Sequence, residues 1–166
     1  DQLIELLREA GLKMVYVGVE SYERDVLKDI SRFTVSNAEQ FNVIKKLEDN
    51  DIIVKSMFMF GSPTDTVKTI KNTIDYSKHL TNQVVQFSIF TPYPGTPMYK
   101  NYMNKIKESK YENFNQYNLV YNHETLDNSK INDLKSYAYK QFYFRLKKLP
   151  IIMKSFLSLL KFFVFF

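Results

Sequence analysis

Three short apolar runs, separated by stretches with helical periodicity, constrain the fold of this chain more than any other feature. The runs cover residues 14–19, 52–60 and 84–90, and their centres lie about 30 to 40 residues apart. That spacing is typical of successive strand–helix units in a parallel α/β fold. Right-handed crossovers would place the three strands side by side in chain order. The near-continuous apolar character of the first run predicts a buried strand of a parallel sheet.

Capping residues place the helices around these runs. A helix before the first run ends at Gly11, a residue type that often follows helix C-termini. Ser36 and Glu39 have the spacing of a capping box and start another helix. Asp65 is predicted to be the N-cap of a helix over about residues 65–80, because a carboxylate accepts hydrogen bonds from the free N–H groups at a helix start.

The last part of the chain predicts a long helix over about residues 130–148, capped within residues 127–129. Its expected buried face follows helical spacing: Ile131, Leu134, Tyr137, Ala138, Phe142 and Leu146. The predicted fold class is therefore α/β, a partial (β/α) TIM-like barrel with three parallel strands and a C-terminal helical extension. We divide the chain into the C-terminal half of a partial barrel (1–110), a helical extension (111–150) and an apolar tail (151–166).

The absence of cysteine from all 166 residues excludes several kinds of chemistry. The chain cannot form disulfides, use a thiolate in catalysis, or hold zinc or an iron–sulfur cluster with its own cysteines. His79 and His123 are isolated in the sequence, so we expect surface histidines and no metal site.

Charge and hydropathy set the C-terminus apart. After Asp133, the last acidic residue, come seven lysines and arginines. As a helix, residues 151–166 would span about 24 Å, which is short of the roughly 20 residues that cross a bilayer. We expect an interfacial amphipathic helix on an anionic membrane, with packing on another part of the protein as the alternative. The tail lacks the polar, aromatic-interleaved pattern of a nucleic-acid groove, so we expect no nucleic-acid partner. We expect a cytoplasmic protein that is peripheral on the inner membrane face.

Three segments resemble motifs of the radical S-adenosylmethionine (SAM) superfamily in their order and spacing. They are residues 10–21 (AGLKMVYVGVES), residues 58–66 (FMFGSPTDT) and residues 90–99 (FTPYPGTPMY). Residues 111–150 resemble the looser C-terminal part of the family. The resemblance is strongest to the cobalamin-associated branch, which includes anaerobic cyclases and methyltransferase-like enzymes.

This resemblance implies that SAM binds across the carboxyl ends of the strands, where parallel barrels hold their ligands. Glu20, followed by Ser21, is implied to accept hydrogen bonds from the ammonium group or the ribose of SAM. Arg32 is implied to pair with a carboxylate of the cofactor. The alternatives are a helix cap for Glu20 and a solvated charge for Arg32.

The other cofactor-binding residues that the resemblance implies follow the second and third strands: Gly61, Ser62, Pro63 and Thr91. Gly61 would let the backbone approach adenine, and the edges of Phe58 and Phe87 are expected to line the ring. The resemblance assigns no catalytic residue and no metal ligand to this chain. The Pro-Gly-Thr-Pro turn after Thr91 has the alternative role of steering the chain off the third strand.

The chain departs from the family pattern in several places. Family members hold a [4Fe-4S] cluster with a CxxxCxxC loop, which is absent here and is expected in a missing N-terminal half, together with a cobalamin domain. Met57 and Asp65 stand where Gly and Glu are usual, and Arg32 replaces the commoner Lys.

The resemblance thus implies the C-terminal fragment of a radical SAM enzyme with an unknown small-molecule substrate, inactive alone. The alternatives are a non-catalytic remnant, a subunit that completes a barrel with a separate cluster-bearing chain, and an unrelated parallel α/β domain.

The apolar tail gives a first testable prediction. Complete protein should float with vesicles that contain anionic phosphatidylglycerol, and deletion of residues 151–166 should abolish this, because the deletion removes the apolar face. Vesicles of neutral phosphatidylcholine control for charge. Equal flotation with and without the tail would contradict membrane binding.

Overall fold

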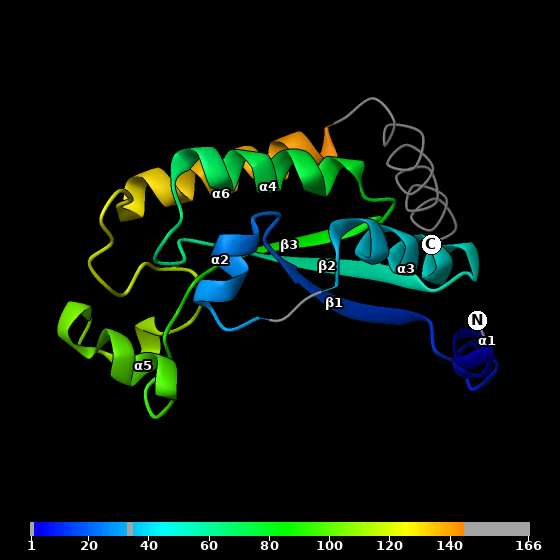
Figure 1. The fold of residues 1–166 in the computed structure, drawn as a ribbon, viewed down its shortest axis with the longest axis horizontal. Helices are drawn as coiled ribbons and strands as arrows, with labels where there is room; N and C mark the ends of the chain where they lie inside the picture. Colours follow the sequence, from blue (N-terminus) through cyan, green and yellow to red (C-terminus); the bar gives the residue numbers. More distant parts are fainter. Residues whose placement is uncertain (1, 33–34, 145–166) are drawn as a thin grey trace, which may run out of the picture.

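A computed structural model describes residues 2–32 and 35–144 of this chain. Strands β1 (Met14–Glu20), β2 (Ile53–Phe60) and β3 (Val84–Ile89) form one parallel sheet in the order β1-β2-β3 (Figure 1). The sheet is open, and its order is the one that right-handed crossovers predict. The predicted α/β architecture of a partial TIM-like barrel is confirmed.

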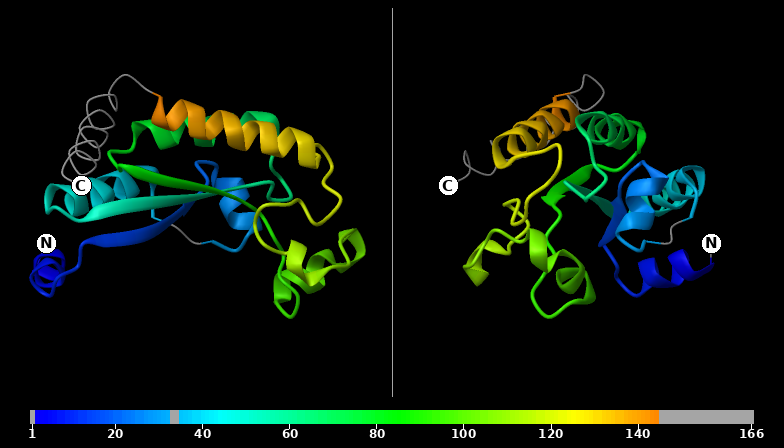
Figure 2. Two further views of the ribbon diagram at one scale, coloured as in Figure 1. Left: turned by 180° about the vertical axis from the view of Figure 1, so that it is seen from behind. Right: turned by 60° about the vertical axis from the view of Figure 1, so that its left-hand side comes forward.

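Helices lie on one side of this sheet and leave most of the other side free. The helices are α1 (Gln2–Glu9), α2 (Arg24–Asp29), α3 (Asn37–Asp49), α4 (Val67–His79), α5 (Pro97–Tyr102) and α6 (Asn128–Tyr143). Figures 1 and 2 show α3, α4 and α6 over the same face, while α1 and α5 project beyond the opposite face at its two ends. The predicted capping box is present. The N–H of Ser36 donates to the Glu39 carboxylate, and the N–H of Glu39 donates to the Ser36 hydroxyl.

Side chains alternate between these two faces, as strand geometry requires. Towards the helices, Phe87 stacks on Phe58 and Phe60 with ring centroids 5.4 and 5.2 Å apart, and Tyr139 of α6 meets the Phe87 ring edge-on. All three phenylalanines are at most 1% exposed. The prediction that the edges of Phe58 and Phe87 line a cofactor was therefore wrong, because these rings form the core beneath α6.

The opposite side of the sheet is called the open face here. It carries the residues that alternate with the buried ones: Met14, Tyr16, Gly18, Ile53, Lys55, Met57, Met59, Val84, Gln86 and Ser88. On β1, Tyr16 remains 60% exposed and Met14 37% exposed. The prediction of a buried first strand was wrong for this chain, because β1 lies at the edge of the sheet with one uncovered face.

Side-chain and loop groups occupy the outer edge of β3. The N–H of Val85 donates to the hydroxyl of Tyr143 (3.3 Å), and the N–H of Phe87 donates to that of Tyr139 (3.1 Å). The N–H of Ile89 donates to the carbonyl of Gln116 (2.8 Å). An edge strand with satisfied N–H groups does not accept another strand. The helical extension therefore ends the sheet at β3.

The predicted long helix is confirmed as α6, with Asp127 as its N-cap. Four of its predicted core residues are buried: Ile131, Leu134, Ala138 and Phe142. Tyr137 is 45% exposed, so its predicted burial was wrong; its position lies off the narrow stripe that contacts β3 and α4. Leu146, the predicted helix end at 148 and the apolar tail lie outside the described residues. Among residues 2–32 and 35–144, no helix is long and apolar enough to span a membrane.

Gly61 and Gly95 allow a matched stability test. Both have positive φ (80° and 86°), but a Cβ on Gly61 would lie 2.4 Å from Cδ1 of Ile131, whereas one on Gly95 would meet nothing within 4 Å. We expect G95A to cost about 1 kcal/mol from backbone strain, and G61A to cost about 1–3 kcal/mol more from overpacking. Urea denaturation of the complete protein measures both. Equal costs would show that α6 does not pack on the loop after β2.

Candidate functional site

Glu20 and Arg32 form an ion pair at the carboxyl end of β1. The strand register shifts between Gly18 and Glu20, and Glu20 takes a left-handed backbone conformation (φ 64°). Its side chain folds back over Gly18, where its Oε1 accepts a hydrogen bond from Nη2 of Arg32 at 2.8 Å. A Cβ at position 18 would lie 2.6 Å from that Oε1, so any larger residue there would displace the ends of the Glu20 and Arg32 side chains from this arrangement. A non-glycine residue in this conformation is strained, as is common at functional sites.

Ser21 points the other way and anchors the strand end. Its side chain is 1% exposed; its Oγ lies 3.1 Å from Oγ1 of Thr73 in α4 and accepts a hydrogen bond from the N–H of Glu23. The N–H of Tyr22 also donates to Thr73. Ser21 therefore fixes the backbone that carries Glu20. Its hydroxyl points into the protein and away from the open face, and the implied contact of Ser21 with SAM stays a prediction.

The loop after β2 is built around the buried carboxylate of Asp65. Its Oδ2 accepts hydrogen bonds from the N–H groups of Gly61 (2.9 Å) and Ser62 (3.1 Å), and its Oδ1 accepts one from the hydroxyl of Thr69 (2.7 Å). The N-cap of α4 is Thr66, which forms a capping box with Thr69. The prediction of Asp65 as N-cap was wrong, because this carboxylate binds the preceding loop and leaves the cap to its neighbour.

A segment about 60 residues further along the chain, which contains Tyr121 and His123, hydrogen-bonds to the same loop from its other side. The carbonyls of Gly61 and Ser62 accept hydrogen bonds from the Tyr121 hydroxyl (2.7 Å) and the His123 ring (2.9 Å). Nδ1 of His123 accepts from backbone N–H groups, so the proton on Nε2 makes the bond to Ser62. Burial raises the pKa of Tyr121, which keeps its hydroxyl a donor. His123 is therefore not the plain surface residue that was expected. His79 is exposed, and among the described residues its ring bonds to the carbonyl of Asp75 in its own helix.

The implied adenine-side residues are thus mostly engaged within the protein. Gly61 packs against Ile131, and Ser62 is fully buried. Thr91 is 9% exposed and donates its hydroxyl to the carbonyl of Ile89 at 3.1 Å. Pro63 is partly exposed. The structure therefore brings Glu20 and Arg32 together, with the guanidinium exposed and the carboxylate largely covered. The loop after β2 is held by hydrogen bonds on both sides and forms a wall of the site.

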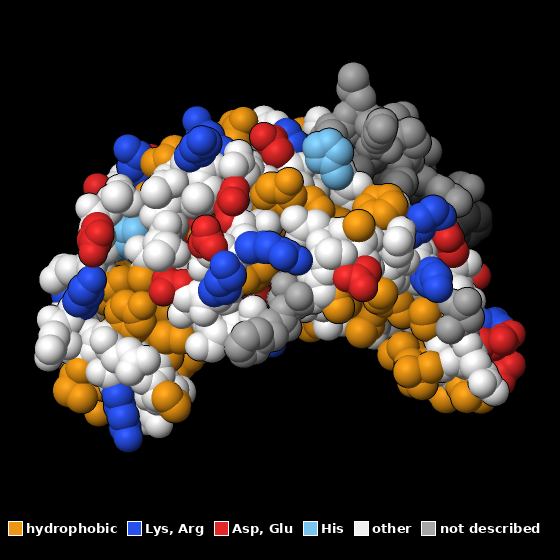
Figure 3. Space-filling view, viewed as in Figure 1, with side chains coloured by type: hydrophobic (Ala, Val, Ile, Leu, Met, Phe, Trp, Pro, Cys, Tyr) orange, Lys and Arg blue, Asp and Glu red, His pale blue; other side chains and the backbone are white. Residues whose placement is uncertain are grey.

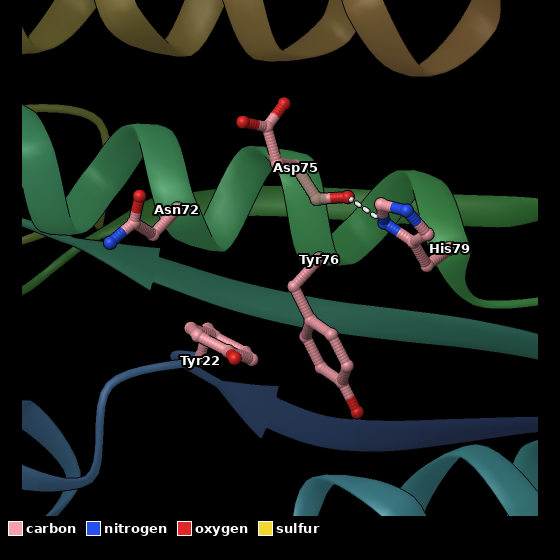
Figure 4. A pocket seen from close by; sticks show the side chains of 5 residues that line it. All are labelled: Tyr22, Asn72, Asp75, Tyr76 and His79. Atoms are coloured by element: carbon pink, nitrogen blue, oxygen red, sulfur yellow. Dashed lines mark hydrogen bonds between the residues drawn. The ribbon is translucent and has the colours of Figure 1, made fainter.

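The Glu20–Arg32 pair borders a hollow side of the molecule. Figure 3 shows the protein arched below the sheet, between α5 and α1, with hydrophobic side chains along both projecting ends. The open face forms the roof of this arch. A separate depression of about 540 Å³ lies on the helical side, lined by Tyr22, Asn72, Asp75, Tyr76 and His79 (Figure 4). None of the predicted site residues lines it, so the candidate site built from those residues lies at the hollow side instead.

Among the residues that the structure describes, no group of three or more histidine, aspartate or glutamate side chains could hold a metal ion. The candidate groups are an exposed guanidinium and the largely buried carboxylate that it pairs with, at a strand end beside a concave sheet face. These features define the class: a piece of a parallel α/β barrel, a fold that binds its ligands at the carboxyl ends of the strands.

Comparison with known proteins tests the resemblance. The model of the radical SAM superfamily matches residues 1–77, just under half of the chain, and the resemblance to that superfamily is confirmed. The match covers β1, the Glu20–Arg32 pair, β2 and most of α4.

Three relatives extend the similarity beyond residue 77. Bacteriochlorophyllide d C-12(1)-methyltransferase of Chlorobaculum tepidum is 23% identical over 130 residues, which cover 78% of this chain and 28% of the relative. Bacteriochlorophyllide d C-8(2)-methyltransferase of the same organism is 28% identical over 120 residues (70% and 27%). Anaerobic magnesium-protoporphyrin IX monomethyl ester cyclase of Rubrivivax gelatinosus is 22% identical over 143 residues (86% and 26%). The resemblance to this branch is confirmed, and the chain spans about a quarter of the length of these relatives.

Asp65 gives a prediction with a definite sign. Burial raises its pKa to about 6, against the hydrogen bonds that favour the carboxylate. Because the folded-state pKa exceeds the unfolded one, its favourable contribution is complete below about pH 4 and is lost as the pH rises through 6. The destabilisation by D65N should therefore be larger at pH 4.5 than at pH 7.5, by on the order of 1–3 kcal/mol.

Urea denaturation of the complete protein at both pH values measures this difference. D49N, which removes an exposed carboxylate on α3, is the matched control and should lack the trend. A D65N penalty that grows with rising pH would contradict the raised pKa.

Proposed function

We propose that this chain is the C-terminal part of the catalytic core of a radical SAM enzyme, and that Glu20 and Arg32 help to hold SAM. The observation that carries this proposal is the strained, partly exposed ion pair at the carboxyl end of β1, within the segment that matches the superfamily. The side chains differ in exposure, 12% for Glu20 and 54% for Arg32, so a ligand can reach Arg32 first.

The chemistry of the pair fits the cofactor. The amino-acid part of SAM carries an ammonium and a carboxylate, and its ribose carries two hydroxyls. Glu20 can accept a hydrogen bond from the ammonium or from a hydroxyl. Among the described residues the Arg32 side chain donates only to Glu20, through Nη2, which leaves donors for a carboxylate. A zwitterion can therefore bind beside the existing pair without leaving either charge unmatched.

The pair alone does not supply the reaction. In this superfamily a [4Fe-4S] cluster provides the electron for reductive cleavage of SAM, and this chain has no cysteine to ligate one. We propose that a CxxxCxxC segment outside the chain holds the cluster, either in the same polypeptide or in a separate subunit. Cobalamin use by the complete protein is a further proposal, supported only by the branch to which the relatives belong.

The concave open face would then contribute to the substrate cavity. The relatives are named for methyl transfer to, or cyclisation of, large tetrapyrroles. A broad, partly apolar sheet face is compatible with a bulky small molecule, and the reaction on it is proposed to be radical chemistry started by SAM cleavage.

The test is SAM binding and reductive SAM cleavage by the complete, cluster-reconstituted protein. E20A should weaken SAM binding by about 10- to 100-fold, since a charge-assisted hydrogen bond is worth about 1.5–3 kcal/mol. E20Q keeps the shape without the charge and should lose most of the same affinity. D49A breaks the exposed Lys45–Asp49 pair of α3 and serves as the control.

Unchanged SAM affinity and cleavage in both Glu20 variants would reject this assignment. Protein that binds SAM through Glu20 but never cleaves it, in the presence of its cluster-bearing segment, would instead favour a non-catalytic remnant.

A further inference from the structure

Lys55 lies on the open face, separate from the Glu20–Arg32 pair. Lys55 is the third residue of β2 and lies opposite Tyr16 of β1 in the strand register. Its Nζ sits 4.8 Å from the centre of the Tyr16 ring, a cation–π distance. Both side chains project from the face away from α4 and α6.

The ammonium group of Lys55 has no acidic partner in the described part of the chain. Lys55 forms no ion pair and no hydrogen bond with the residues in 2–32 and 35–144. Glu20, a carboxylate on the same face, is already paired with Arg32. An ammonium that is half-buried on a sheet face gains from a bound anion, which removes the cost of partial desolvation.

The surroundings of Lys55 are flat and apolar. Val84 lies opposite Lys55 on β3, and Ile53 and Met57 flank it on β2 along the same face. Tyr16 adds a ring that is 60% exposed. An aromatic or broad apolar molecule can lie against these side chains while its anionic group meets the ammonium.

The position relative to the ion pair is set by strand geometry. Tyr16 and Lys55 lie two residues before Gly18 and Met57, which is about 6.6 Å along the strands. Glu20 and Arg32 cover Gly18. A molecule held at Lys55 is therefore within reach of the group that the pair would hold.

We propose that Lys55 and Tyr16 form a subsite for the anionic group of the substrate, and that this substrate is a flat apolar molecule with a carboxylate or similar anion. The proposal rests on the proposed function, since it makes the open face the substrate cavity. Lys55 neutralises the anion, Tyr16 supports the lysine and stacks on the apolar part, and the neighbouring methionine and aliphatic side chains form the floor.

The test uses two probes of like shape on the complete protein. The aromatic anion 8-anilinonaphthalene-1-sulfonate carries a sulfonate, whereas N-phenyl-1-naphthylamine lacks it. K55M should weaken binding of the anionic probe at least tenfold and change binding of the neutral probe less than twofold. K55R should retain at least half of the affinity for the anion. K71M, at an exposed lysine of α4, is the matched control and should change neither.

Several results would overturn the proposal. Equal anion affinity in K55M and K71M would show that the anion does not bind at Lys55. A lower melting temperature in K55M with unchanged anion binding would mean that Lys55 serves a structural ion pair. SAM affinity, measured in parallel with E20A, reports on the proposed function separately. Loss of anion selectivity in K55M together with Glu20-independent SAM binding would support this subsite and reject only the SAM assignment.

Discussion

The hydrogen bonds from the outer edge of β3 to two tyrosine hydroxyls and a loop carbonyl determine at which edge further strands can pair with this sheet. Because Val85, Phe87 and Ile89 have partners there, no strand can be added beyond β3. No described residue hydrogen-bonds to the outer edge of β1, so a larger sheet can extend only on that side. The barrel is thus kept from closing at β3 by its own helical extension. The same extension buries the phenylalanine core and positions the segment that fastens the loop after β2.

The polar residues of the candidate site divide into those that present charge to the hollow side and those that hold the backbone. Glu20 and Arg32 present charge at a strand end, whereas Ser21 and Asp65 use their polar groups inside the protein. The rigid wall formed after β2 matters to the site because a backbone that is bonded on both sides cannot move into the hollow. Ligand binding there would depend on shape and on exposed side chains, not on free N–H groups of that loop.

Sequence reasoning predicted the features that depend on local chemistry. The Ser36 capping box, the strand order and the burial stripe of α6 all follow from nearest-neighbour preferences and chain connectivity. It failed where tertiary contacts decide. Thr66 and Asp65 are both competent N-caps, and only the position of the Gly61–Ser62 backbone selects between them. The apolar run of β1 predicted burial, but an edge position leaves Tyr16 exposed. The tyrosine bonds to β3 join residues more than 50 positions apart, beyond any local pattern.

The space over Gly18 links three positions that are not adjacent in the chain. The carboxylate at position 20 and the guanidinium at position 32 occupy the volume that any larger side chain at position 18 would claim. Changes at the three positions should therefore not have independent effects. A bulkier residue at position 18 would have to displace the ends of the charged side chains at positions 20 and 32, which then could pair only in a different arrangement. The side chain at position 18 therefore decides where the charged pair can sit on the sheet face.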